Sequence, residues 1–227
     1  MKPILFNTEM VQAILDGRKT VTRRVLKEPW YIEDDEVSRV SGLAMHRGIA
    51  ATHMMPYPDQ PYHPGNILYV RETWAAWSRT DGTAPTLHYK ADGETLPGVK
   101  WHRSIHMPRE AARIFLRVTD VRVEQLQDSF FKPGVTILAC QDEGIDIGDQ
   151  CRECIENYGS PCCIDENDGD EERECECGLL DDLRAEFSDL WDSTIKPADR
   201  ALYGWDADPW VWVVGFERIT KEEAEHG

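Results

Sequence analysis

An acidic, cysteine-rich segment most limits what this 227-residue chain can fold into. Residues 141–182 hold 16 Asp and Glu, only two Arg and six of the seven cysteines. The remaining residues are close to neutral, with 26 Asp and Glu against 23 Lys and Arg, although the whole chain has a net charge of −17. Such a shift of composition marks an insertion or a separate module. We therefore predict one domain, residues 1–145 and 179–220, with an insert at 146–178 and a tail at 221–227.

The cysteines of the insert have the spacing of metal ligands. They are Cys151, Cys154, Cys162, Cys163, Cys175 and Cys177. A C-x-x-C pair is common in tetrahedral Zn²⁺ sites, and a second pair about 20 residues further on can close such a site. We predict a structural zinc site formed by Cys151, Cys154 and two of the other four, and six thiolates suffice for more than one metal. The alternative is a disordered acidic tract whose thiols hold no metal.

The remaining composition favours a cytoplasmic globular protein. Hydrophobic residues make up 41% of the chain, which is enough to bury a core. No apolar run approaches the roughly 18–20 residues that span a membrane, and none follows Met1 as in a signal peptide. An odd number of cysteines in a reducing compartment favours metal binding or free thiols over disulfides. Cys140 stands apart from the others, and we expect it to be a small buried residue.

Hydrophobic periodicity predicts an α+β domain with several strands and few helices. Asn7 or Thr8 is expected to cap a helix that continues to about Asp16. Alternation and β-branched content predict strands at residues 3–6, 67–74, 86–90, 112–123 and 209–217. Further helices are expected at residues 125–128, 137–143 and 178–191, and residues 28–64 are assigned to a long loop.

The segment that follows the first predicted helix is rich in cations and hydroxyls. Residues 16–24 read Asp-Gly-Arg-Lys-Thr-Val-Thr-Arg-Arg, with four cations and two threonines. Gly17 is the residue that most easily takes the left-handed conformation that closes a helix. The chain should therefore leave the helix sharply and present Lys19 and Thr22 to an anionic or carbonyl-bearing ligand. The alternative is a solvated basic helix end, because cations also favour helix C-termini.

This segment and two later ones resemble the ASCH family of the PUA-like superfamily. The pattern is Gly17 to Arg24 after the first helix, then a strand that Gly65-Asn66 introduces and that ends in Val-Arg-Glu-Thr-Trp. The late Tyr-Gly-Trp-Asp-x-x-Pro-Trp-Val-Trp, residues 203–212, is similar to the end of phage and prophage ASCH proteins. The resemblance covers about residues 1–27, 65–145 and 179–220.

The resemblance implies a small PUA-like β-barrel with flanking helices and a cleft for RNA or a modified nucleoside around Lys19 and Thr22. One bacterial branch of the family is an amidohydrolase that removes the acetyl group from N(4)-acetylcytidine. Carried over to this chain, that activity makes Thr22 the nucleophile and Lys19 its base. Glu143, with Asp142 as second choice, would handle the proton that goes to the leaving amine.

Further cations and aromatic residues are candidates for ligand contacts. The first set is Arg18, Arg23, Arg24, Arg71, Glu72 and Trp74. A wider set suited to a nucleic-acid groove adds Lys90, Lys100, Trp101, His102, Arg103, His106 and Arg109. The alternative is that the tryptophans are core residues and the charges a solvated face. Arg71 and Glu72 are adjacent in a strand, so one of them should point inward, where a buried charge needs a partner or a ligand.

Three functions fit these patterns. The first is an ASCH domain that binds RNA or a modified nucleotide in the Lys19 and Thr22 cleft. The second is an enzyme in the same cleft, an amidohydrolase on acylated cytidine or a ribonuclease. The third is an interaction protein of phage or prophage origin that binds a protein partner through its zinc-clamped acidic insert.

Overall fold

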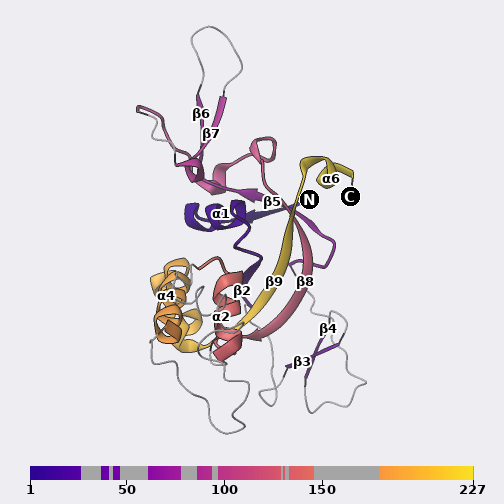
Figure 1. Ribbon diagram of the computed structural model, residues 1–227, viewed down its shortest axis with the longest axis vertical. Helices are drawn as coiled ribbons and strands as arrows, with labels where there is room; N and C mark the ends of the chain where they lie inside the picture. Colours follow the sequence, from indigo (N-terminus) through magenta and orange to yellow (C-terminus); the bar gives the residue numbers. More distant parts are fainter. Residues whose placement is uncertain are drawn as a thin grey trace, which may run out of the picture. The chain divides into compact units, whose positions relative to one another are not determined.

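The computed structural model describes residues 1–26, 37–40, 43–46, 61–77, 86–93, 97–128, 130, 133–145 and 179–226. The predicted insert at 146–178, with its six cysteines, lies outside these residues. The chain divides into two compact units (Figure 1). Unit 1 comprises residues 1–20, 60–121 and 215–227, and unit 2 comprises residues 21–59 and 122–214.

The main sheet has five strands in the order β1-β5-β8-β9-β2. β1 (Lys2–Leu5) runs parallel to β5 (Ile67–Arg71), which is antiparallel to β8 (Phe115–Gln125). β9 (Trp210–Ile219) and β2 (Val21–Val25) complete the order, and β8 and β9 each continue from one unit into the other. Since β1 and β2 are the ends of this order, the described pairings do not close a barrel. The predicted α+β class is confirmed.

Unit 1 packs a helix and a hairpin against its part of the sheet. The hairpin consists of β6 (Trp74–Trp77) and β7 (Thr86–Tyr89) (Figure 1). Three short 3-10 helices follow: η1 (Lys90–Asp92), η2 (Ser104–His106) and η3 (Arg109–Ala111). One apolar cluster of this unit consists of Met107, Ala111, Ala112, Phe115, Ile219 and Ala224, with Ile67, Tyr69, Trp74, Leu87 and Tyr89 packed against it.

Local signals set both ends of α1 (Thr8–Leu15). Asn7 caps it, because its Oδ1 accepts a hydrogen bond from the backbone N–H of Met10 at 2.8 Å. Gly17 has φ +77°, and a Cβ there would meet no atom within 4 Å, so backbone conformation alone favours glycine. The N–H groups of Arg18 and Lys19 both donate to Ala13 O, at 2.9 and 3.0 Å. The predicted helix and its sharp exit are confirmed.

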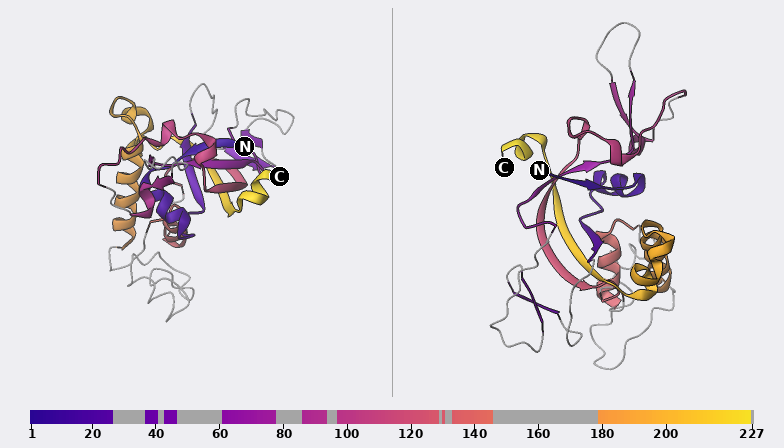
Figure 2. Two further views of the ribbon diagram at one scale, coloured as in Figure 1. Left: turned by 90° about the horizontal axis from the view of Figure 1, so that it is seen from above. Right: turned by 180° about the vertical axis from the view of Figure 1, so that it is seen from behind.

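Unit 2 is built around two helices, α2 (Pro133–Asp142) and α4 (Leu179–Thr194), which pack side by side (Figure 2). They are followed by η4 (Pro197–Asp199), α5 (Arg200–Tyr203) and η5 (Trp205–Ala207). The core contains an aromatic group in which the Phe130 and Phe187 rings stack at 4.2 Å and Trp205 meets both rings edge-on. The hairpin of β3 (Val37–Val40) and β4 (Leu43–His46) also belongs to this unit.

The structure corrects four details of the predicted elements. The strand expected at 67–74 breaks after Arg71, and its last residue starts β6, because Trp74 pairs with Tyr89 of β7. Residues 37–46, expected in a long loop, contain the β3–β4 pairing, and residues 126–128 form a turn in place of a helix. The tail forms α6 (Lys221–His226).

The tail helix had a readable sequence signal. Thr220 Oγ1 accepts from Glu223 N at 3.2 Å, and a Glu223 carboxylate oxygen accepts from Thr220 N at 2.8 Å. This reciprocal pair is a capping box, which Thr-Lys-Glu-Glu spells in the sequence. Within the described part of the chain, no helix is both long and apolar enough to cross a membrane.

Candidate functional site

The described residues that bury polar or charged side chains include all three predicted catalytic residues. Lys19, Thr22 and Glu143 are 2%, 1% and 5% exposed, and Arg23 and Glu72 are also buried. Charged side chains are rarely buried without a partner, so each of them requires a local explanation. Lys19 belongs to unit 1, whereas Thr22, Arg23 and Glu143 belong to unit 2.

Lys19 follows the turn at Gly17 and lies over an aromatic ring of unit 1. Its Nζ is 5.9 Å from the centroid of the Phe6 ring, within the range of a cation–π interaction. Phe6 is itself buried and packs against Phe216 with ring centroids 6.1 Å apart. The Lys19 side chain is therefore buried against an aromatic ring of unit 1.

Arg23 lies at the centre of a buried ion-pair network in unit 2. Its Nη1 donates to Glu143 Oε1 at 2.8 Å, and its Nη2 donates to Glu124 Oε1 at 3.0 Å. The second oxygen of Glu124 accepts from Arg122 Nε at 2.9 Å. The side chains of Arg23 and Glu143 are 2% and 4% exposed, so solvent screens their attraction little. The network joins β2, β8 and the end of α2.

Aromatic rings cover the Arg23 guanidinium. Its Cζ is 4.9 Å from the centroid of Phe130 and 5.8 Å from that of Phe187. Arg23 Nε is buried and has no hydrogen-bond partner among the described residues. An unpaired buried donor costs about 1–3 kcal/mol, so it is a position where a bound acceptor would add stability.

The end of α2 fixes Glu143 beside Arg23. Glu143 N donates to Ala139 O at 3.1 Å, and the next residue, Gly144, has φ +89°. Ile145 N then donates back to Cys140 O at 3.0 Å, which closes the helix in the manner of a Schellman turn. A carboxylate at a helix C-terminus is opposed by the helix dipole, so the cation of Arg23 offsets an unfavourable position.

Cys140 lies one turn before Glu143 and is fully buried, as predicted. Burial raises the pKa of its thiol to about 12, while Arg23 lowers it to a smaller extent and Glu143 raises it slightly further. Cys140 is therefore a neutral thiol at physiological pH and has no nucleophilic role in this network.

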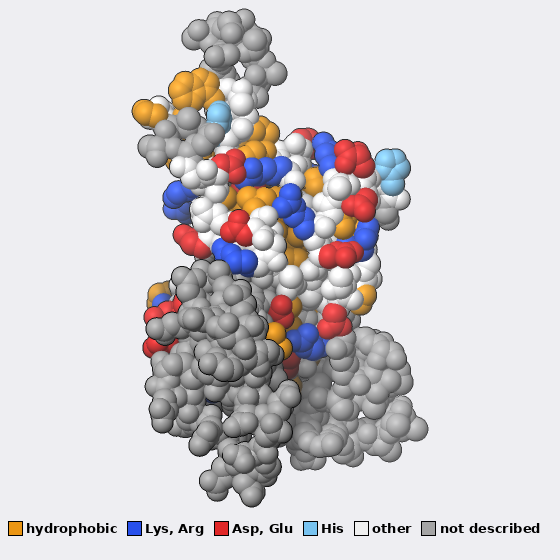
Figure 3. Space-filling model, viewed as in Figure 1, with side chains coloured by type: hydrophobic (Ala, Val, Ile, Leu, Met, Phe, Trp, Pro, Cys, Tyr) orange, Lys and Arg blue, Asp and Glu red, His pale blue; other side chains and the backbone are white. Residues whose placement is uncertain are grey.

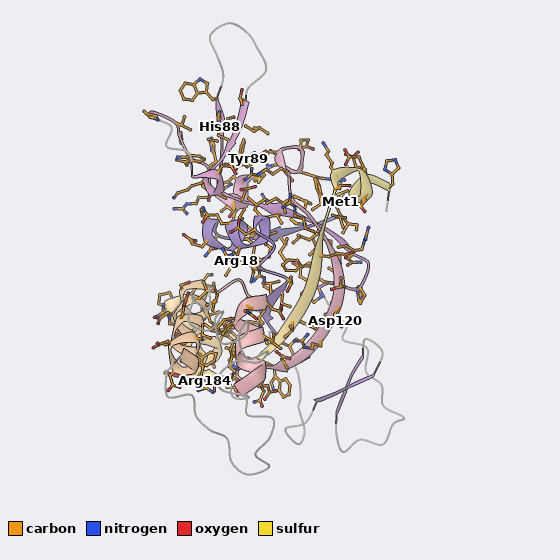
Figure 4. All side chains as sticks on the ribbon, in the orientation of Figure 1. Met1, Arg18, His88, Tyr89, Asp120 and Arg184 are labelled. Carbon is orange, nitrogen blue, oxygen red and sulfur yellow. The ribbon has the colours of Figure 1, made fainter. Side chains whose placement is uncertain are left out.

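The other cations of the 16–24 segment lie outside the buried network. Arg18 is exposed at the end of α1 (Figure 4) and forms a 3.1 Å ion pair with Asp16. Arg24 is half-buried and donates through Nη1 to the backbone carbonyl of Arg23 at 3.0 Å. Arg23, from the same segment, pairs with Glu143 in the buried network.

Glu72 in unit 1 has the charged partner that a buried carboxylate requires, and that partner is Arg113. Arg113 donates to both Glu72 carboxylate oxygens, at 2.9 and 3.1 Å, and to both oxygens of Asp92, at 2.9 and 2.7 Å. Arg113 Cζ also lies 3.9 Å from the centroid of the Tyr89 ring. Burial raises the pKa of Glu72, and the hydrogen bond from Arg113 opposes this rise. The cluster ties β6, β7 and η1 to the start of β8.

Arg71 and Trp74 make internal contacts in unit 1. Arg71 Nε donates to Met107 O at 3.0 Å and its Nη2 donates to Ile105 O, so the guanidinium holds the loop around η2. The Trp74 ring stacks near His102 at 5.1 Å and packs against the apolar cluster of unit 1. Both side chains have structural contacts, and a direct role in ligand binding stays a prediction.

Several residues of the site were not singled out from the sequence. They are Glu124, Phe130, Phe187 and Arg113. Glu124 is 101 residues from its partner Arg23 and Arg113 is 41 residues from its partner Glu72, so no local spacing points to them. One local signal was present. Glu72 lies in the predicted strand at residues 67–74, where a buried carboxylate needs a cation from another segment.

Comparisons of the chain with protein-family models, with curated proteins and with solved structures give no match. The resemblance to the ASCH family therefore rests on the sequence motifs alone.

Proposed function

We propose that the chain is a PUA-like ASCH domain protein that binds a modified nucleoside, or an unstacked base of RNA, around Thr22, Arg23 and Glu143. The observation that carries the proposal is the buried ion pair between Arg23 and Glu143. It sets a fixed cation beside a fixed carboxylate in unit 2, and Arg23 follows Thr22 in the segment that the family motif identifies.

The chemistry of this pair suits the edge of a nucleobase. A carboxylate accepts hydrogen bonds from an exocyclic amine, as acidic residues do from cytosine N4. The buried Arg23 Nε supplies a donor that a base carbonyl can satisfy. Side chains that are less than 6% exposed cannot track a duplex backbone, so the ligand is a small nucleoside or a single base turned out of its strand.

An amidohydrolase is the second candidate, and the burial of both Lys19 and Thr22 favours it. Thr22 Oγ would attack the acyl carbonyl while Lys19 takes its proton, and the C–N bond would then break. The amine would leave with a proton, and water would hydrolyse the acyl-threonine. Glu143 would have to donate that proton, whereas the Arg23 pair stabilises its ionised form. The geometry therefore supports binding better than catalysis.

Calorimetric titration with cytidine, N(4)-acetylcytidine and uridine tests the binding proposal. We expect the two cytidines, which have an N4–H, to bind at least about tenfold more tightly than uridine, which has none. Glu143→Gln should lose this preference, because an amide offers a weaker acceptor. Glu217→Gln is the matched control, since Glu217 is exposed and pairs only at the surface with Arg117. If no nucleoside binds, or if Glu143→Gln keeps the preference, the proposal is wrong.

The catalytic alternative has a separate readout. N(4)-acetylcytidine is incubated with the protein and the products are separated by chromatography. Recovery of unchanged N(4)-acetylcytidine that still binds supports a binding protein. Release of cytidine and acetate, with loss of release in Thr22→Val, would establish the amidohydrolase instead.

A further inference from the structure

We propose that a second surface, a sheet face in unit 1, binds single-stranded nucleic acid by stacking its bases. The aromatic face, as we call it, consists of Trp77 of β6, His88 of β7, and Trp101 with Arg103 of the following segment. It shares no residue with the buried site around Arg23 and does not depend on that site for its argument.

Backbone pairing brings the three segments of this face together. β6 and β7 are antiparallel, with Trp74 opposite Tyr89, Ala75 opposite His88 and Trp77 opposite Thr86. On its other side Trp74 forms an antiparallel bridge with His102, through backbone hydrogen bonds of 3.2 and 2.7 Å. The segment around His102 therefore extends the hairpin as a third strand-like edge.

Alternation separates the two faces of this small sheet. Trp74, Leu87 and Tyr89 pack against the apolar cluster of unit 1, and His102 contacts Trp74 on the same side. Neighbours along an extended backbone point to opposite sides. Ala75, Trp77 and His88 therefore belong to the opposite, outer face, and none of them is a member of that cluster, although Ala75 is fully buried.

The third segment adds two more side chains to the outer face. Trp101 and Arg103 flank His102, and Arg103 has extended backbone angles, φ −66° and ψ 148°. The antiparallel bridge places Trp101 next to Ala75 and Arg103 next to Thr73. One row across the sheet thus consists of Trp101, Ala75 and His88, in which Ala75 is the smallest residue and lies in the middle.

The aromatic side chains and the arginine of the outer face are at least partly exposed, whereas Ala75 in the middle of the row is fully buried. Trp77 is 42% exposed, Arg103 is exposed, and His88 and Trp101 are half-buried. Figure 4 marks His88 on β7, and Figure 3 shows hydrophobic and histidine side chains gathered over the β6–β7 hairpin. Aromatic residues on a sheet face are the platform on which many proteins stack unpaired bases.

The charges near this face fit a polyanion. Residues 97–109 contain Lys100, Arg103 and Arg109 and no Asp or Glu. Unit 1 as a whole has 13 Lys and Arg against 12 Asp and Glu, whereas unit 2 has 12 against 30. Cations beside stacking rings neutralise phosphates and give salt-dependent affinity. These charges favour nucleic acid over an apolar protein partner.

The test is fluorescence anisotropy of a labelled single-stranded RNA of about ten nucleotides, titrated with the full chain at about 50 mM salt. We expect binding that weakens as salt rises, and that is weaker for a duplex of the same length because its bases are already stacked. Equal binding of duplex and single strand would overturn the stacking argument, and no binding of either would overturn the proposal.

Two variants with matched controls locate the binding. Trp77→Ala and Arg103→Glu should each weaken single-strand affinity by about tenfold, in line with the loss of one stacked base or one phosphate contact. Leu202→Ala and Lys221→Glu are the controls, because both side chains are exposed, at 67% and 62%, and neither is on the aromatic face. If the variants bind RNA as their controls do, the aromatic face is not the binding surface.

The buried site is tested separately from this surface. Saturating cytidine should leave the oligonucleotide affinity of the wild-type protein within about twofold of its value without cytidine, because the two sites share no residue. Displacement of the oligonucleotide by cytidine, together with unchanged oligonucleotide affinity in Trp77→Ala, would assign the RNA to the buried site and overturn this proposal alone.

Discussion

Arg23 Nη1 and Glu143 Oε1 are 2.8 Å apart, although their residues are separated by 120 positions in the chain. The pair joins β2 to the end of α2, among apolar and aromatic side chains. Buried ion pairs seldom add stability over well-packed apolar residues, because desolvation of both charges offsets their attraction.

Removal of one member of this pair should be costly. Arg23→Met leaves Glu143 as a buried carboxylate without its cation, so we expect the free energy of unfolding to fall by about 3–5 kcal/mol. The double variant Arg23→Met/Glu143→Leu removes both charges and should recover most of that loss. Urea denaturation measures both effects.

The exposed pair of Arg117 and Glu217 provides the control for this experiment. Arg117→Met should cost less than about 1 kcal/mol, because solvent screens that pair. If Arg23→Met lowers the free energy of unfolding no more than Arg117→Met does, the loss of the cation does not destabilise the buried network and the prediction is wrong.

Glu72 should make stability depend on pH in a defined direction. Burial raises its pKa above the ordinary value, and Arg113 opposes that rise while Asp92 adds to it. A carboxyl whose pKa is higher in the folded protein stabilises the fold most at low pH, and this contribution is lost as pH rises through the folded pKa. The stability of wild type relative to Glu72→Gln should therefore decrease as pH rises from about 4.

Denaturation of both proteins at a series of pH values gives this difference directly. A stability difference that increases with pH would mean that the ion pair with Arg113 outweighs burial, and that the pKa of Glu72 is lowered. Arg113→Lys should be destabilising at every pH, because an ammonium cannot reproduce the two forked contacts to Glu72 and Asp92.

Substitutions at Thr22 distinguish a role in binding from a role as nucleophile. Thr22→Val keeps the shape of the side chain and removes its hydroxyl, so a lost neutral hydrogen bond would weaken nucleoside affinity by roughly fivefold. Thr22→Ser should keep both affinity and any hydrolysis. Affinity that is unchanged in Thr22→Val would exclude the hydroxyl from the nucleoside site.

The cysteine-rich insert should contain zinc. We expect about one Zn²⁺ per chain by elemental analysis of the purified protein, because two thiolate pairs complete a tetrahedral site. Cys154→Ser should lose most of the metal. Cys140→Ser is the control, since Cys140 is buried in the core of unit 2 and should not affect metal content. A zinc content well below one Zn²⁺ per chain in wild type would contradict the predicted zinc site.

Local sequence patterns were sufficient for most elements and for the choice of candidate residues. Asn7 and Gly17 set the limits of α1 through their own backbone preferences, and alternation located the long strands. The capping box at Thr220 was equally readable and would have predicted α6. Lys19, Thr22 and Glu143 are buried, and their role in a site stays a prediction. Each of these features depends on residues within a few positions of one another.

Tertiary structure alone decided which charged side chains pair and which aromatic side chains stay exposed to solvent. Arg23 finds Glu143, and Glu72 finds Arg113, because strand order and helix packing bring distant segments within hydrogen-bond distance, and no spacing in the chain encodes that. The register of β6 turned Trp74 into the core and left Trp77 exposed, since alternate residues of a strand face opposite sides. The sequence by itself determined the local elements and the chemically capable residues, whereas long-range packing determined their partners.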